Sequence, residues 1–307
     1  MNILIVRNDK LGDFITALPT CKVLKEYDPQ NRITVLVAPL NEELAKECDF
    51  IDEVIVDRGE SVGELARKLK SYGFDVSVTL FSNTRVALAQ FMAGIPKRIA
   101  PATKIAQIFY NRRVKQRRSQ VKMAEFEYNL QLAKALFEDI SLKYPKPLCP
   151  FNVPKEDIIV FHPGFGGSSD ANFSLDEYVE MIDVVLQKGK YRVVLTFGPD
   201  EEELCRRMQE KLAGRDVEFK VSKDGLIAFA KFLAGVRLFV STSTGTYHLA
   251  SLVGTPTLTF FADTLFASSK RWKSIGDEKI QKHYMLPEDE SKRKAILEEV
   301  KRTLSAL

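Results

Sequence analysis

Short apolar runs alternate with longer stretches of mixed apolar and polar residues along the first half of the chain. The apolar runs predict buried strands at residues 3–6, 33–37, 54–56, 76–80 and 98–100. Apolar positions at helical spacing predict helices at residues 14–26, 40–47, 62–72, 85–93 and 123–137. Because strands alternate with helices, we expect parallel strands joined by crossover helices, as in a Rossmann-like sheet.

The same alternation restarts after a proline-rich stretch at residues 144–150, which we interpret as an interdomain linker. Strands are predicted at residues 158–161, 192–197, 217–221, 238–240 and 257–261. Helices are predicted at residues 175–187, 226–233, 249–253 and 291–304, with another beginning near residue 200. The predicted fold class is α/β, with two Rossmann-like domains, residues 1–150 and 151–307, facing each other across a cleft. We expect the terminal helix to pack back toward the first domain.

Composition places the chain among ordinary globular proteins. It has 307 residues, of which 45% are hydrophobic and 28% charged, enough to bury a large core. The net charge of +4 is too small to indicate nucleic-acid binding by itself. Four cysteines and three histidines lack the spacing of metal ligands, so no metal site is predicted. Neither a leader segment nor a membrane-spanning run is apparent, which favours a cytoplasmic protein.

Small polar residues at positions 241–248 join a predicted strand to a predicted helix. Such residues let an anion approach the backbone, and a helix N-terminus offers free N–H groups and positive charge. We hypothesise that this stretch binds the diphosphate of a nucleotide donor through Ser243, Thr244, Gly245 and Thr246. An ordinary helix cap explains the same residues. His248 either contacts the phosphate or packs in the core. A second candidate turn, residues 164–169, also follows a strand, so both are expected at one sheet edge.

Asp13 lies just after the first predicted strand, at the sheet edge where Rossmann-like proteins bind ligands. A carboxylate there can take the proton from an acceptor hydroxyl as the oxygen attacks an anomeric carbon. Arg7, Lys10 and Gly12 lie on the same turn, and we expect them to meet an anionic acceptor. Alternatively, Asp13 caps the helix that is predicted to begin at Phe14.

Basic residues are concentrated at positions 104–122, with Arg112, Arg113 and Arg117 near the centre. Apolar and aromatic residues at 105–110 precede them. This combination suits a segment that touches an anionic membrane or binds a lipid-linked phosphate or sugar acid. A solvated helix face is the alternative interpretation. Nucleic-acid binding is disfavoured, because no recognised nucleic-acid motif accompanies the charges.

Four patches of the sequence resemble motifs of one family: RNDKLGDFITALP at 7–19, HPGFGG at 162–167, GPD at 198–200, and TGTYHLA with GTP at 244–250 and 254–256. Together they resemble glycosyltransferase family nine, the bacterial heptosyltransferases that build the lipopolysaccharide inner core. The resemblance implies a GT-B fold, inverting transfer without a metal, and ADP-heptose as the usual donor. It also implies Asp13 as the base and a lipid A–Kdo type of acceptor, whose carboxylates and phosphates suit the basic segment.

Two positions depart from the family pattern. Ser243 stands where the family has the aspartate of its D-T-G motif, which meets hydroxyls of the donor sugar. Ala171 stands where the family has a lysine that contacts donor phosphate, and Ser169 or Asn172 would offer neutral hydrogen bonds instead. These differences leave the glycosyltransferase class intact and the donor sugar open.

We therefore predict an inverting, metal-independent glycosyltransferase that moves a sugar, in first place heptose from ADP-heptose, onto a lipopolysaccharide inner-core acceptor. No cofactor and no nucleic-acid partner is expected, since the nucleotide sugar is a substrate. The predicted location is the cytoplasm, with peripheral contact to the cytoplasmic face of the inner membrane. The alternatives are a catalytically silent nucleotide- or sugar-binding protein on the same scaffold, and a family member with another donor.

Overall fold

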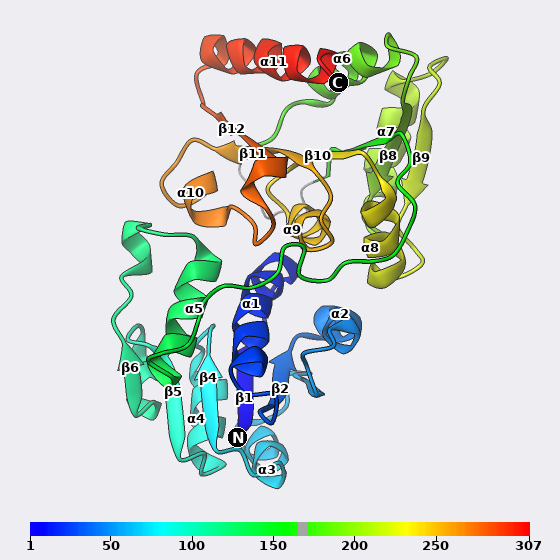
Figure 1. The fold of residues 1–307 in the computed structure, drawn as a ribbon. Coiled ribbons are helices and arrows are strands. Elements are labelled where there is room, and N and C mark those ends of the chain that lie inside the picture. Colours follow the sequence, from blue (N-terminus) through cyan, green and yellow to red (C-terminus); the bar gives the residue numbers. More distant parts are fainter. Residues whose placement is uncertain (165–170) are drawn as a thin grey trace. The chain divides into compact units, whose positions relative to one another are not determined.

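Two six-stranded sheets, in which each strand pairs in parallel with its neighbours, form the framework of the chain (Figure 1). The computed structural model describes residues 1–164 and 171–307. One sheet lies in the unit Met1–Pro145 and the other in the unit Lys146–Leu307. The boundary between the units falls inside the proline-rich stretch at residues 144–150.

The first unit builds its sheet in the order β3-β2-β1-β4-β5-β6. The central strand β1 is apolar from Ile3 to Val6 and buried there, as expected for a parallel strand covered on both faces. The strands are β1 Asn2–Arg7, β2 Arg32–Val37, β3 Glu53–Val56, β4 Val76–Thr79, β5 Lys97–Pro101 and β6 Arg112–Val114. The helices are α1 Leu11–Tyr27, α2 Glu42–Glu47, α3 Val62–Ser71, α4 Thr84–Met92 and α5 Glu125–Leu136, with 3₁₀ turns η1 Pro39–Asn41, η2 Ile105–Phe109 and η3 Arg118–Gln120.

The second unit builds its sheet in the order β12-β11-β10-β7-β8-β9. Its helix α6 starts at a capping box, in which Ser174 and Glu177 each accept a hydrogen bond from the other's backbone N–H. The strands are β7 Ile158–His162, β8 Arg192–Phe197, β9 Glu218–Val221, β10 Leu238–Thr242, β11 Thr257–Ala262 and β12 Gln281–Leu286. The helices are α6 Leu175–Leu186, α7 Glu202–Lys211, α8 Leu226–Gly235, α9 Gly245–Leu252, α10 Ser269–Trp272 and α11 Glu290–Ser305, with the 3₁₀ turn η4 Glu278–Ile280.

Both sheets follow the same strand order. Numbered within its own unit, each runs 3-2-1-4-5-6, which is the order of dinucleotide-binding Rossmann sheets. The order reverses between β1 and β4 in the first sheet and between β7 and β10 in the second. Ligands of such sheets bind beyond the carboxyl ends of the strands at this switch point. The prediction of an α/β fold with two Rossmann-like sheets is confirmed. The two switch points, one in each sheet, are therefore the places where ligands are expected.

Several local predictions were wrong. Helix α1 begins at Leu11 instead of Phe14, because its N-cap residue Lys10 makes no side-chain cap and leaves no signal in the sequence. Helix α9 begins at Gly245 instead of Leu249. The basic segment contains the short edge strand β6 between two 3₁₀ turns, so it is not a helix face. Strand β12 and the short helix α10 were not predicted, since their mixed polar residues mask the usual periodicity.

The terminal helix α11 packs against α6 and β12 of its own unit. Its packing toward the first unit stays a prediction. Within residues 1–164 and 171–307, no helix is both long and apolar enough to cross a bilayer. In the same described part of the chain, no group of three or more His, Cys, Asp or Glu side chains is arranged to hold a metal ion.

Candidate active site

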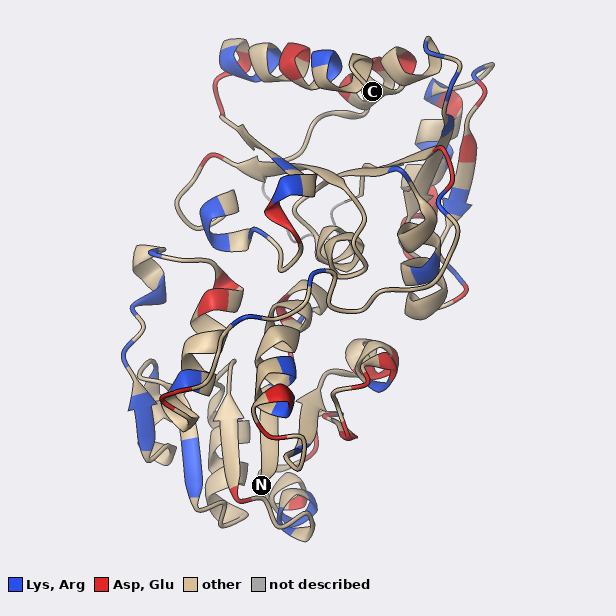
Figure 2. Cartoon of the chain, in the orientation of Figure 1, with Lys and Arg blue, Asp and Glu red and all other residues tan. Residues whose placement is uncertain are grey.

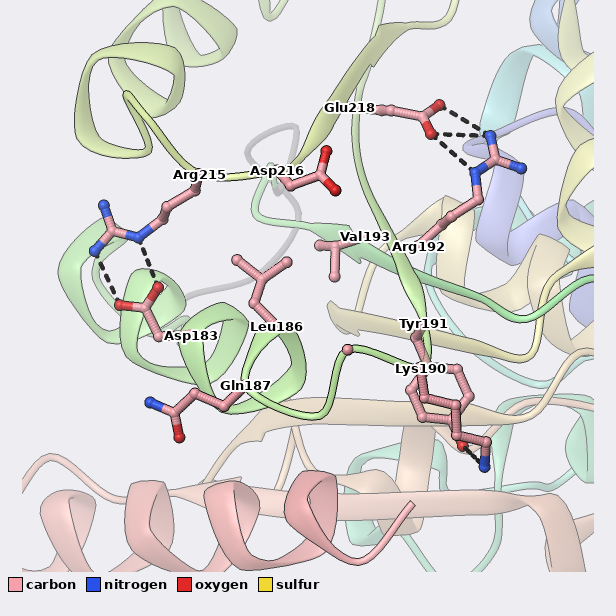
Figure 3. Close-up of a pocket in the computed structure, with 11 residues that line it drawn as sticks. Asp183, Leu186, Gln187, Lys190, Tyr191, Arg192, Val193, Arg215, Asp216 and Glu218 are labelled. Carbon is pink, nitrogen blue, oxygen red and sulfur yellow. Dashed lines mark hydrogen bonds and ion pairs between the residues drawn. The ribbon is translucent and has the colours of Figure 1, made fainter.

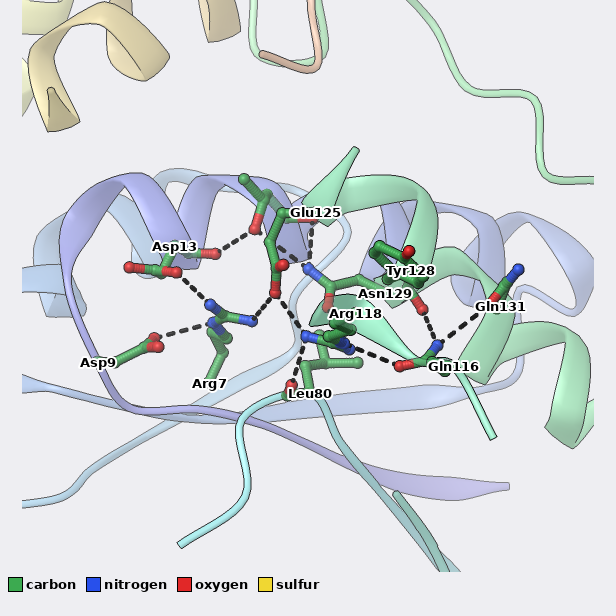
Figure 4. A network of polar contacts seen from close by, with 11 residues as sticks. Arg7, Asp9, Asp13, Leu80, Gln116, Arg118, Glu125, Tyr128, Asn129 and Gln131 are labelled. Carbon is green, nitrogen blue, oxygen red and sulfur yellow. Dashed lines mark hydrogen bonds and ion pairs between the residues drawn. The ribbon is translucent and has the colours of Figure 1, made fainter. Parts of the chain in front are cut away.

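Arg7, the last residue of β1, is the centre of a polar network at the carboxyl end of the first sheet (Figure 4). Its side chain is only 3% exposed, and its Nε lies 2.9 Å from Asp9 Oδ1. Its Nη2 donates to Asp13 Oδ1, and its Nη1 lies 3.3 Å from Glu125 Oε1. One buried guanidinium therefore gathers carboxylates from the turn after β1, from α1 and from α5. This network occupies the switch-point position where Rossmann-like sheets bind ligands.

Glu125 connects Arg7 to a second arginine. Arg118 Nη1 donates to Glu125 Oε1, and Arg118 Nε donates to Gln116 Oε1 at 2.9 Å. The Arg118 guanidinium also lies 5.6 Å from the centre of the Tyr128 ring. Sequence reasoning missed Glu125 and Arg118 as parts of the site. No local signal could have found them, because 118 residues separate Arg7 from Glu125.

Burial and charge act in opposite directions on this network. Burial alone would lower the pKa of Arg7, but the carboxylates of Asp9, Asp13 and Glu125 raise it, and the net result is above its ordinary value. Burial raises the pKa of Asp9 to about 6; the charge of Arg7 opposes this rise and that of Asp13 adds to it. Arg7 is thus a permanent cation that donates a charge-assisted hydrogen bond to Asp13.

Asp13 is the third residue of α1, so it lies in the first helical turn and is neither in a turn before the helix nor its N-cap. Its side chain is 19% exposed. The positive end of the helix favours a carboxylate at this position. Within the described residues, its carboxylate hydrogen bond uses Oδ1, which leaves Oδ2 able to accept a proton. Thr16 Oγ1 donates to the Asp13 carbonyl at 2.6 Å and fixes this helical turn.

The predicted acceptor residues divide into two groups. Lys10 is exposed at the N-cap of α1 and Gly12 is its second residue, so both accompany Asp13. Arg7 accompanies Asp13 too, but its guanidinium is buried among carboxylates and is not a surface cation. Arg112 and Arg113 lie on β6, separated from β1 by β4 and β5.

Two further cations follow the carboxyl ends of β5 and β6. Arg117 is exposed and has a left-handed backbone, with φ of 48°. Lys104 also has a positive φ, of 57°, and its Nζ lies 5.2 Å from the centre of the Phe81 ring. The Arg7 guanidinium approaches the same ring, at 5.8 Å. Lys104 therefore belongs to the rim of the network, although sequence reasoning did not name it as a site residue.

His162, Gly164 and Glu201 meet at the carboxyl ends of β7 and β8 in the second unit. The buried imidazole of His162 lies 3.0 Å from Thr196 Oγ1 through Nδ1 and 4.0 Å from Glu201 Oε2 through Nε2. Burial lowers the pKa of His162, so the ring is neutral at pH 7. Gly198 N–H donates to Glu201 Oε2 at 2.7 Å. A Cβ at Gly164 would overlap the Glu201 carboxylate, so any larger residue there would displace this carboxylate from its present position.

The stretch at residues 241–248 forms the end of β10 and the start of α9. Thr244 is the N-cap of α9 and its hydroxyl makes no cap bond; its Oγ1 lies 2.8 Å from Thr246 Oγ1 instead. Within the described residues, Gly245 and Thr246 therefore open the helix without a cap from the Thr244 side chain. The Ser243 N–H donates to the Phe260 carbonyl at 2.9 Å. These contacts put Thr244, Gly245 and Thr246 at the switch point of the second sheet.

His248 is buried, with Nδ1 3.1 Å from Ser274 Oγ, and burial lowers its pKa to about 3. It is a packed, neutral imidazole. The Asn172 amide is used within the protein: Nδ2 donates to the Pro163 carbonyl at 2.7 Å, and Oδ1 accepts from Tyr178 Oη at 2.9 Å. These contacts fix the orientation of the amide and use its oxygen and one of its two N–H groups. Ser169, the other predicted neutral contact, lies outside the described residues.

A cavity of about 630 Å³ lies elsewhere in the second unit (Figure 3). Two ion pairs line it: Arg215 Nε is 2.6 Å from Asp183 Oδ1, and Arg192 Nη2 is 2.9 Å from Glu218 Oε1. Arg192 begins β8 and Glu218 begins β9, so the cavity lies at the amino ends of these strands. That is the edge of the sheet opposite to the switch point, and the cavity is not the candidate active site.

Comparison with known proteins identifies the family of the chain. Residues 62–301 match the model of a protein family described as "Glycosyltransferase family 9 (heptosyltransferase)". A "Putative glycosyltransferase" of Haemophilus influenzae is 34% identical over 305 residues, which cover 92% of this chain and 87% of the relative. "Lipooligosaccharide heptosyltransferase 2" of Campylobacter jejuni is 23% identical over 272 residues, 86% of this chain and 82% of the relative.

Solved structures are similar over the whole chain. "E. coli ADP-heptose lps heptosyltransferase II" has a TM-score of 0.79 at 18% identity and covers 99% of this chain and 98% of its own. "E. coli heptosyltransferase WaaC with ADP" has a TM-score of 0.74 at 20% identity, covering 98% of this chain and 100% of its own. At this identity the likeness shows the fold alone. It confirms the predicted GT-B fold class.

Proposed function

The chain belongs to glycosyltransferase family 9 and is a glycosyltransferase, and from this premise we propose that it transfers heptose from ADP-heptose to a lipopolysaccharide inner-core acceptor with inversion. The observation that carries the proposal is the position of Asp13. It is a partly exposed carboxylate at a helix N-terminus, held by a buried arginine at the switch point of a Rossmann sheet. A general base needs this combination of fixed geometry and access to a substrate hydroxyl.

In the proposed step, an acceptor hydroxyl attacks the anomeric carbon of the donor sugar from the face opposite the diphosphate. The new oxygen–carbon bond forms as the carbon–oxygen bond to phosphate breaks, and ADP leaves with the bonding electrons. The proton of the hydroxyl passes to Asp13, and attack from the opposite face inverts the anomeric centre. Lys10, Gly12 and Arg117 are proposed to bind the anionic groups of the acceptor. Arg112 and Arg113 stay predicted contacts for its more distant charges.

The donor site is proposed at the start of α9. Thr244, Gly245 and Thr246 present backbone N–H groups and the positive end of the helix to a diphosphate. These groups stabilise the charge that develops on the leaving phosphate, so transfer is proposed to need no metal. Two solved structures of one relative, E. coli heptosyltransferase WaaC at 20% identity, carry "ADP" and "ADP-2-deoxy-2-fluoro heptose" in their names, which supports an ADP-linked donor here.

Glu201 is proposed to hold the ribose of the donor. It follows the second strand of its sheet, where dinucleotide-binding Rossmann units place an acidic residue that accepts hydrogen bonds from ribose hydroxyls. The Gly198 N–H holds its carboxylate in place, and Gly164 leaves room for it. His248, which is buried and neutral, has no charge to offer the diphosphate and is assigned to packing around α9.

A second candidate function differs from the first in the identity of the donor sugar. Ser243 replaces the family's sugar-binding aspartate, and the buried Ala171 replaces its phosphate-binding lysine. Both changes remove a charged donor contact, which favours the alternative of a family member with a donor other than ADP-heptose. A catalytically silent binding protein would not require the ordered Asp13–Arg7 pair.

Calorimetry against ADP, UDP, GDP and their sugars tests the proposal. We expect selective binding of ADP and ADP-heptose, with no change in affinity or in transfer when a chelator is added. A preference for UDP- or GDP-sugars would replace the heptose donor and keep the glycosyltransferase. Absence of binding to every nucleotide would refute the donor site at α9. Proton NMR of the product then reports the anomeric configuration, and retention would refute the single displacement.

A further inference from the structure

Four large, strongly exposed apolar side chains lie close together in the first unit. Phe91 and Met92 end helix α4, and Ile105 and Ile108 lie on the 3₁₀ turn η2. Ile105 is 76% exposed and Ile108 66%, and the other two are each more than half exposed. The two elements pack together, with the rings of Phe91 and Phe109 6.0 Å apart. We name the four exposed side chains the apolar knob.

The exposure of the knob follows from how η2 is attached. A 3₁₀ turn has three residues per turn, so Ile105 and Ile108 share one side of it. The residues between and after them face inward: Ala106 and Tyr110 are buried against Ala87 and Ala100. Tyr110 Oη also lies 3.2 Å from Ser82 Oγ. Because η2 is anchored on one side, the two isoleucines are held outward at an energetic cost that a binding partner would remove.

The chain around the knob carries positive charge and no negative charge. Residues 85–124 contain ten Lys or Arg and no Asp or Glu, whereas the whole chain has a net charge of +4, so all other residues together carry −6. Three of the ten, Arg85, Arg112 and Arg118, pair with Asp57, Glu138 and Glu125. The others gather on β5, on β6 and in the loops beside them, as the blue segments of Figure 2 show.

Individual cations border the knob directly. The Arg98 guanidinium lies 5.3 Å from the centre of the Phe91 ring, and Lys104 immediately precedes η2. Arg113 is in register with Ala100, whose side chain packs with α4 and η2. Neighbouring residues on paired parallel strands face the same side, so Arg113 points toward the side that carries the knob.

We propose that the apolar knob and its surrounding cations form a docking surface for an anionic lipid bilayer. Exposed aliphatic and aromatic side chains enter the headgroup–acyl boundary, while Arg98, Lys104 and Arg113 meet lipid phosphates. A protein partner would be matched by the apolar knob alone. Because residues 85–124 carry a surplus of Lys and Arg and no Asp or Glu, this surface favours a bilayer with anionic headgroups over a neutral one. This inference goes beyond the proposed transfer reaction and does not rest on it.

The test is co-sedimentation of the purified full-length protein with phosphatidylcholine vesicles, with and without phosphatidylglycerol, and with no sugar substrate present. We expect binding that requires phosphatidylglycerol and weakens with salt. Ile105→Ser with Ile108→Ser should lower the partition coefficient by at least about tenfold, and Ile108→Trp alone should raise it. Lys104→Gln with Arg113→Gln should also lower it by about tenfold or more.

The matched control is Leu265→Ser with Phe266→Ser. These two apolar residues of the second unit are each just over half exposed, and their replacement should change the partition coefficient by less than about twofold. Equal binding to both kinds of vesicle, or an equal loss in the control, would overturn the proposal. So would a knob variant that changes the oligomeric state in sedimentation, because the knob would then be a contact between copies. None of these outcomes bears on donor binding, which is measured separately.

Discussion

Glu125 forms ion pairs with both Arg7 and Arg118, so the stability of the first site depends on the charge of this one carboxylate. Glu125→Gln keeps the shape of the side chain and removes its charge. Glu125 is 4% exposed, Arg7 3% and Arg118 17%. Removing one partner of a buried ion pair costs roughly 3–5 kcal/mol. Because Arg7 keeps Asp9 and Asp13, and the glutamine oxygen still accepts a hydrogen bond, we expect the lower end, about 3 kcal/mol.

Hydrogen exchange followed by mass spectrometry measures this loss where it occurs. A loss of about 3 kcal/mol raises the open population, and thus the exchange of the most protected amides of α1 and α5, on the order of a hundredfold. Amides of α9, in the second unit, should not change. The control is Glu138→Gln: Glu138 is 90% exposed, lies 3.8 Å from Arg112, and should cost less than about 0.5 kcal/mol. If Glu125→Gln changed the hydrogen exchange of α1 and α5 no more than Glu138→Gln does, the ion-pair network around Glu125 would not stabilise the helices that carry the site.

Two further predictions concern the second unit. Glu201→Gln should weaken ADP binding by about tenfold in calorimetry, because a charged acceptor of hydroxyl hydrogen bonds is lost. The control is Glu202→Gln, at an exposed neighbouring residue, which should leave ADP binding unchanged. Equal effects of the two variants would contradict the ribose role of Glu201. Burial lowers the pKa of His248 to about 3 and that of His283 to about 4. Below pH ~6.5 these imidazoles are therefore protonated in the unfolded chain but still neutral in the folded unit. Stability should therefore fall between pH 7 and 5, by about 2 kcal/mol per imidazole, in urea unfolding followed by Trp272 fluorescence. A pH-independent midpoint would show that the folded unit does not keep these two imidazoles neutral.

The sheet framework could be predicted because it depends on local patterns. Strands β1 to β4 are short apolar runs, and their alternation with amphipathic helices permits few topologies. Asp13 was predicted as a site residue from its place after β1, although its helix begins earlier than predicted. Lys10 leaves no capping signal there, so the sequence could not place Asp13 inside the helix.

The rest of the site depends on contacts between distant residues. Glu125 reaches Arg7 only because α5 packs on α1, and no pattern near either residue records this. The basic segment was recognised from its charges, but its strand β6 forms by pairing with β5, which local propensity does not reveal. Asn172 has the right chemistry for a ligand, and only the structure shows that its amide is used by Pro163 and Tyr178.

The central claim is that Asp13 is the base of a sugar transfer, and single-turnover transfer from ADP-heptose tests it most directly. Asp13→Asn keeps the size of the side chain and removes its ability to take a proton. We expect the transfer rate to fall by ~10²–10⁴-fold, while the affinity for ADP, measured on the same preparation, stays unchanged. A fall of less than about tenfold would contradict the account and remove Asp13 from the reaction.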